Sequence, residues 1–186
     1  HILDWGYPLE TLRIFECGNI IEDVWTRVLS KSPGYRVLGT QLKAYHRFKI
    51  DGDPVEIHGR IDILVQHPDT RIVVHEVKTT SSTYYLKDEA KPEHIRQVTF
   101  YMEATGLEFG QIDYLDKSNF LNGQGIIDHT YPQIRRPDLF HDTLNLCRVL
   151  HGYLRANQLP PKNHCWKCRK KKNSDEHYCK YWDLCQ

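Results

Sequence analysis

The chain has 186 residues, of which 40% are hydrophobic and 26% charged, and 25 basic against 24 acidic side chains leave a formal net charge of +1. This composition is ordinary for a globular protein and permits one core, so we expect neither a disulfide scaffold nor a chain whose net charge selects its partner. No apolar run approaches the roughly 20 residues that cross a bilayer, and no signal segment opens the chain. A membrane-spanning or secreted protein is therefore not expected.

The first half of the chain predicts one helix followed by three strands. Apolar residues recur at helical spacing over residues 12–29, before a Ser-Pro-Gly turn. Residues 35–50 are extended, and the turn signal at 51–54 leads into a second strand at 55–66, which indicates a hairpin. Residues 71–79 form the third predicted strand.

The second half predicts a helix, two strands and a last helix. Helical spacing over 91–105 ends at a glycine, and strands are expected at 109–115 and 125–130. An amphipathic helix follows at 137–156, whose predicted inner face is Leu139, Thr143, Leu146, Leu150, Tyr153 and Leu154. A Leu-Pro-Pro sequence then separates a domain at 1–160 from a cysteine-rich tail at 161–186.

The strand predicted at 55–66 alternates between two kinds of residue. One set is apolar or glycine, namely Ile57, Gly59, Ile61, Ile63 and Val65. The other set is polar, namely Glu56, His58, Arg60 and Asp62. Because successive side chains point to opposite faces of a strand, one face is expected to be core and the other charged.

The next strand is apolar until its carboxyl end, where Glu76 and Lys78 point the same way. Asp62 and Glu76 on neighbouring strands can share a hard cation such as Mg²⁺, with the backbone carbonyl of Val77 as a further ligand. A cation and a lysine are what phosphoryl chemistry needs. The alternative is an ordinary group of cross-strand ion pairs.

Two helices add side chains that fit the same chemistry. Gly18 and Glu22 lie one turn apart, so a glycine that allows close approach would sit beside a third possible metal ligand. His94, Gln97 and Tyr101 share one face of the second helix, so an amide and a phenol lie side by side. Taken alone, each set is also compatible with a solvated helix face.

Together these segments resemble the ordered motifs of the PD-(D/E)XK nuclease superfamily, in its RecB-like exonuclease branch. The segments are Gly18-x3-Glu22, Gly59-Arg60-Ile61-Asp62, Glu76-Val77-Lys78 and Gln97-x3-Tyr101. The resemblance implies an α/β fold with a restriction-endonuclease-like core, in which helices flank a mixed central sheet.

The resemblance also implies roles for individual residues. Asp62 and Glu76 would bind Mg²⁺ or Mn²⁺, Lys78 would be the catalytic lysine, and Gln97 and Tyr101 would organise the site or the DNA. Glu22 takes a place where many RecB-like members carry histidine, and as a carboxylate it favours a hard cation.

Four of the six cysteines crowd the tail, namely Cys165, Cys168, Cys179 and Cys185. Four thiolates suit either a structural zinc or a 4Fe-4S cluster, and such clustering indicates a metal centre rather than disulfides. The aromatic ending resembles the cluster segment of iron-sulfur RecB-like nucleases, including CRISPR-associated and AddB types, which favours 4Fe-4S over zinc. In those nucleases one ligand commonly comes from well before the tail, so Cys17 is an alternative ligand, whereas Cys147 is expected to pack.

The expected function is a metal-dependent DNA nuclease, an exonuclease on single-stranded ends, with recombination or CRISPR-adaptation proteins as possible partners. Arg60, Lys170, Lys171 and Lys172 are candidate contacts to DNA phosphates, although the three lysines could instead offset the thiolate charge. The alternatives are a non-catalytic DNA-binding or assembly module and a structure-selective endonuclease. Reduced cysteines indicate an intracellular location, in a cell's own cytoplasm or, for a viral protein, in that of its host.

Overall fold

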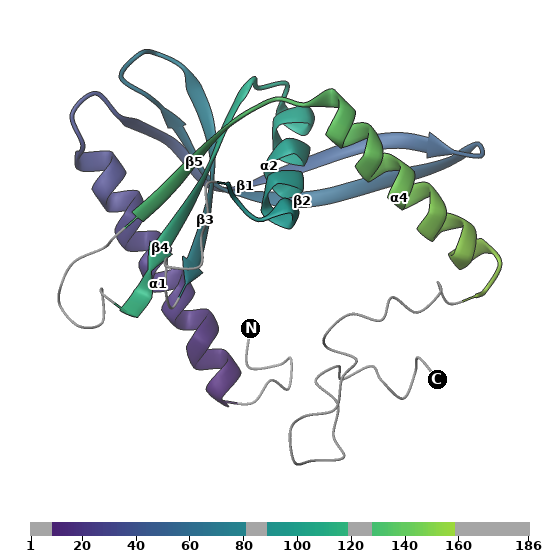
Figure 1. Ribbon diagram of the computed structural model, residues 1–186, viewed down its shortest axis with the longest axis horizontal. Helices are drawn as coiled ribbons and strands as arrows, with labels where there is room; N and C mark the ends of the chain where they lie inside the picture. Colours follow the sequence, from purple (N-terminus) through teal and green to yellow (C-terminus); the bar gives the residue numbers. More distant parts are fainter. Residues whose placement is uncertain (1–8, 81–88, 119–127, 159–186) are drawn as a thin grey trace. The chain divides into compact units, whose positions relative to one another are not determined.

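The computed structural model describes residues 9–80, 89–118 and 128–158, and its elements follow the predicted order (Figure 1). They are α1 (Leu9–Lys31), β1 (Arg36–Ile50), β2 (Asp53–Gln66), β3 (Ile72–Thr80), α2 (Pro92–Thr105), β4 (Phe109–Asp116), β5 (Asp128–Ile134) and α4 (Pro137–Arg155). The chain divides into two compact units, His1–Leu144 and Asn145–Gln186, and the sheet belongs to the first. The predicted domain boundary near residue 160 stays a prediction.

The five strands form one mixed sheet in the order β1-β2-β3-β4-β5. β1 with β2, β2 with β3 and β4 with β5 pair antiparallel, whereas β3 and β4 pair parallel from Val73↔Phe109 to Thr80↔Asp116. Parallel neighbours need a crossover connection, and α2 lies in that connection. The predicted mixed sheet with flanking helices is therefore confirmed.

The helices α1 and α2 cover opposite faces of the sheet. α1 buries Ile21, Trp25 and Leu29 against the odd-numbered residues of the central strands, such as Val77 and Leu115. On the other face, α2 packs against even-numbered strand residues, in clusters that include Val74, Ile112 and Tyr114. Because strand side chains alternate between faces, the α1 cluster, around Ile21, Trp25 and Leu29, and the α2 clusters lie on opposite faces of the sheet.

Two glycines let α2 lie close to the sheet. A Cβ added at Gly59 would stand 2.6 Å from Cε1 of Tyr101, and one added at Gly110 would stand 2.3 Å from Cγ1 of Val98. Both distances are far below van der Waals contact, so any larger residue would push α2 outward. Gly59 therefore sets the distance between Tyr101 on α2 and the strand that carries Asp62.

Two details of the predicted elements are wrong. β5 ends at residue 134 rather than at the predicted 130, and the predicted start at 125–127 lies outside the described residues. The strand continues through Pro132, which is tolerated because β5 is an edge strand. On α4, the predicted inner residues Leu146, Leu150 and Leu154 are 57%, 49% and 69% exposed. Periodicity identified the apolar stripe of that helix, but a stripe is buried only where another segment packs against it.

Within the described ranges, no helix is long and apolar enough to cross a membrane.

Candidate active site

β2 and β3 separate at Asp62. Their pairing ends at Ile63↔His75, and beyond it the Asp62 carboxylate accepts a hydrogen bond from the backbone nitrogen of Val77 at 2.8 Å. A side-chain oxygen therefore takes the place of a carbonyl in the ladder. The alternation predicted for β2 is wrong at this point, because Ile61 packs with the α2 cluster whereas Ile63 packs with the α1 cluster.

Glu76 on β3 is the most confined carboxyl group of the site. It is 0% exposed, and apart from the contact of Lys78 with Oε1 neither of its oxygens accepts a hydrogen bond from the described residues. Lys78 Nζ forms an ion pair with its Oε1. Burial, reinforced by the neighbouring charge of Asp62, raises the pKa of Glu76 to about 7 despite the lysine.

Two further carboxyl groups crowd the same region. Burial raises the pKa of Asp62, although its bond from Val77 and the charge of Lys78 act against this. Burial and the charge of Asp62 raise the pKa of Glu22 on α1, while a hydrogen bond from Gln41 opposes the rise. Three carboxyl groups that resist ionisation in one place are what a bound cation would relieve.

A hollow of about 300 Å³ opens beside these groups, lined by Gly18, Asn19, Glu22, Asp62, Val77, Lys78 and Thr79. Four of the lining residues are those predicted from sequence for metal binding and catalysis. The close approach expected at Gly18 is not made by any described residue, because none of their atoms lies within 4 Å of a Cβ built there. The glycine instead leaves space at the wall of the hollow.

Gln97 and Tyr101 lie side by side on α2, as the helical spacing predicts. Gln97 Nε2 donates to the hydroxyl of Tyr101 at 2.8 Å, and burial raises the pKa of Tyr101 to about 12, so the phenol keeps its proton. His94 lies 2.6 Å from the Tyr114 hydroxyl, and burial together with the charge of Lys78 lowers its pKa to about 4. His94 is therefore neutral at physiological pH.

The donor set suits a hard divalent cation. Carboxylates and a backbone carbonyl are the ligands that Mg²⁺ and Mn²⁺ prefer, and Oε2 of Glu76, which accepts no hydrogen bond from the described residues, is free to bind one. In the described part of the chain, however, no group of three His, Cys, Asp or Glu side chains is arranged closely enough to hold an ion as it stands. Side-chain adjustment on binding is therefore required.

Of the remaining predicted residues, some lie within the described ranges and others do not. Arg60 is exposed, and its charge lowers the pKa of both Glu22 and Asp62, which places it near the site. Cys17 packs against the α1 core, and burial raises the pKa of the Cys147 thiol. The others lie outside the described residues: Cys165, Cys168, Cys179, Cys185, Lys170, Lys171 and Lys172.

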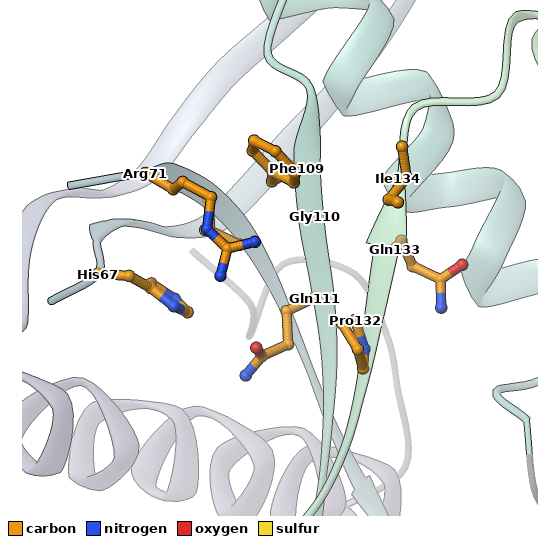
Figure 2. Close-up of a pocket in the computed structure, with 9 residues that line it drawn as sticks. His67, Arg71, Phe109, Gly110, Gln111, Pro132, Gln133 and Ile134 are labelled. Carbon is orange, nitrogen blue, oxygen red and sulfur yellow. The ribbon is translucent and has the colours of Figure 1, made fainter. Parts of the chain in front are cut away.

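Sequence reasoning missed Gln41, whose Nε2 donates to Glu22 Oε1. It also missed a second hollow of about 190 Å³ where β3 and β4 begin. Figure 2 shows His67, Arg71 and Gln111 around this second hollow, which no Asp or Glu lines. Without a carboxylate it offers no site for a hard cation, so the first hollow is the candidate active site.

A family model described as the PD-(D/E)XK nuclease superfamily matches residues 17–186. No curated protein matches the chain. One solved structure, described as "Crystal structure of SSO0001", is similar with a TM-score of 0.55 and 20% identity, over 81% of this chain and 64% of that one. The chain thus spans less than two thirds of that protein, and the likeness concerns the fold alone.

Proposed function

Because the chain belongs to the PD-(D/E)XK nuclease superfamily, we propose that it is a metal-dependent deoxyribonuclease that hydrolyses phosphodiester bonds. The observation that carries this proposal is the fully buried Glu76, whose carboxyl group is repelled by Asp62 and is paired with Lys78 through Oε1 alone. In a purely structural cluster two carboxyl groups buried so close together are unfavourable, whereas as metal ligands they share one cation.

The charged residues in and beside the hollow then have separate tasks. Glu22, Asp62, Glu76 and the Val77 carbonyl would hold Mg²⁺ or Mn²⁺, which supplies charge neutralisation at the scissile phosphate and lowers the pKa of a water. Lys78, whose side chain is 28% exposed, can leave Glu76 and place its ammonium group against the phosphate oxygens or the attacking water.

Tyr101 and Gln97 form a neutral, hydrogen-bonded pair beside this charge. The protonated phenol and the amide can orient the phosphate backbone without adding negative charge, and the exposed Arg60 adds a phosphate contact.

We further propose a RecB-like exonuclease that acts on single-stranded DNA ends in recombination or CRISPR adaptation. The order of the four motifs along the chain supports that branch.

The test is digestion of end-labelled single- and double-stranded DNA with Mg²⁺, Mn²⁺ or EDTA. Wild type and Lys49→Ala, which removes an exposed lysine of β1, are expected to release label only with metal. Lys78→Ala is expected to be slower by about a hundredfold or more, because it removes a cation that stabilises transition-state charge.

Circular single-stranded DNA in the same assay separates the modes of cleavage. An exonuclease leaves the circles intact, and their cleavage would instead identify an endonuclease. A folded wild-type protein that binds DNA but cleaves none of these substrates with either metal would contradict the proposal and favour a binding module.

For the tail we propose a 4Fe-4S cluster on Cys165, Cys168, Cys179 and Cys185, with zinc as the alternative metal. The number of thiolates and the aromatic ending support it. Protein purified without oxygen is expected to be brown and to contain iron and sulfide in equal amounts. A colourless protein with one zinc per chain would show the alternative, and Cys179→Ser should lose whichever metal is present.

A further inference from the structure

Gln41 has an unusual backbone conformation for a residue within a strand. Its φ is +52°, in the left-handed region that disfavours residues with a side chain. β1 and β2 pair on both sides of it, at Thr40↔Ile63 and Leu42↔Ile61, so position 41 stands opposite Asp62. The distortion thus occurs where β2 leaves β3.

The side chain of Gln41 is only half satisfied. Its Nε2 donates to Glu22 Oε1, which orients the amide, because a carboxylate accepts and does not donate. The opposite atom, Oε1, is buried without a hydrogen-bond partner among the described residues. Burying an unpaired amide oxygen is unfavourable.

Two unfavourable features at one residue indicate a requirement other than stability. A hydrogen bond that served only to join β1 to α1 would need neither a left-handed backbone conformation nor a buried, unpaired oxygen. What the arrangement does achieve is to hold the Glu22 carboxylate, whose neighbour Asp62 repels it. Without this bond, Glu22 would be free to turn away from the hollow.

We infer that Gln41 is a positioning residue, which holds Glu22 at the hollow so that Glu22 and Asp62 meet an incoming cation together. This inference rests on the proposed function, because it presumes a divalent metal at Glu22 and Asp62. Residues that orient a metal ligand by a hydrogen bond typically alter metal affinity by about 10- to 100-fold when they are replaced.

The experiment measures Mn²⁺ binding by electron paramagnetic resonance, together with the melting temperature, without DNA. Gln41→Met keeps the length of the side chain but removes the amide, and Gln41→Gly removes the side chain and fits the positive φ. Both are expected to bind Mn²⁺ about 10- to 100-fold more weakly. Gln41→Gly is expected to melt no lower than wild type.

Two further variants complete the design. Asp51→Gly places glycine at another residue of positive φ, +51°, in the β1–β2 turn, and should bind Mn²⁺ as wild type does. Asp62→Asn gives the background binding of the chain without the site. Wild-type affinity in Gln41→Gly, or weakening only in step with a lower melting temperature in both Gln41 variants, would overturn the inference. A folded wild type that binds no more Mn²⁺ than Asp62→Asn would overturn the proposed metal site itself.

Discussion

The Glu76→Gln protein is expected to be more stable than wild type at pH 8 in the absence of metal, and to have lost DNA cleavage. Burial raises the pKa of Glu76 from 4.5 to about 7, so between these two pH values the folded state holds a proton that the unfolded chain has released. Above pH 7 both states are ionised, and the buried charge then destabilises the folded state. Stability from this proton is complete below pH 4.5 and is lost as the pH rises through about 7. The neutral amide of glutamine avoids the loss.

The expected gain follows from the size of that shift. A rise from 4.5 to about 7 corresponds to about 3 kcal/mol above pH 7, shrinking towards zero near pH 4.5. Urea denaturation at pH 5 and pH 8 in EDTA measures it. Cleavage with Mg²⁺ should fall about a thousandfold, because a charged ligand of the cation that assists hydrolysis is gone.

Glu56→Gln is the matched control, since it is the same substitution on the neighbouring strand. A hydrogen bond from Arg47 lowers the pKa of Glu56, so this variant should lose rather than gain stability at neutral pH, and it should still cleave DNA. Equal stability of Glu76→Gln and wild type at pH 8 would show that burial does not destabilise the ionised form of Glu76. Retained cleavage would remove it from the catalytic machinery.

The central part of the candidate site could be predicted because its chemistry interrupts a simple pattern. A buried parallel strand is apolar throughout, so Glu76 and Lys78 at the end of β3 stood out, and the period of two placed both on one face. Glu22 and Gly18 are one helical turn apart, which predicted that they share a surface. These arguments needed only local geometry.

What failed depended on contacts between distant segments. Strand alternation places Ile61 and Ile63 on one face, but Asp62 replaces the ladder with a side-chain bond and the two isoleucines pack with different helices. Gln41 carried no signal, because positive φ is expected from glycine or asparagine rather than glutamine. Such exceptions to local rules are concentrated where the strands separate, at the candidate site.

A bulky residue at position 18 is expected to block cleavage while stabilising the fold. Gly18 lies within α1 and lines the hollow, and no described residue occupies the space around its missing side chain. Gly18→Leu should therefore add about 1 kcal/mol of stability, because glycine is a poor helix former. Its four carbons would stand where the DNA backbone must reach Glu22 and Asp62, so cleavage should fall by about tenfold or more.

The Gly152→Leu variant separates the gain in stability from the loss of cleavage. Gly152 is also a helical glycine with open space around it, but it lies in α4, in the other compact unit. The Gly152→Leu protein should gain a similar amount of stability and should cleave DNA as fast as wild type. Melting temperatures and initial cleavage rates at saturating DNA measure both properties.

If Gly18→Leu were as active as Gly152→Leu, the substrate would not use the hollow beside Gly18, and the phosphate would have to approach Asp62 from the side of α2. A rise in melting temperature together with a fall in cleavage rate, confined to position 18, is an outcome that general damage to the fold cannot produce.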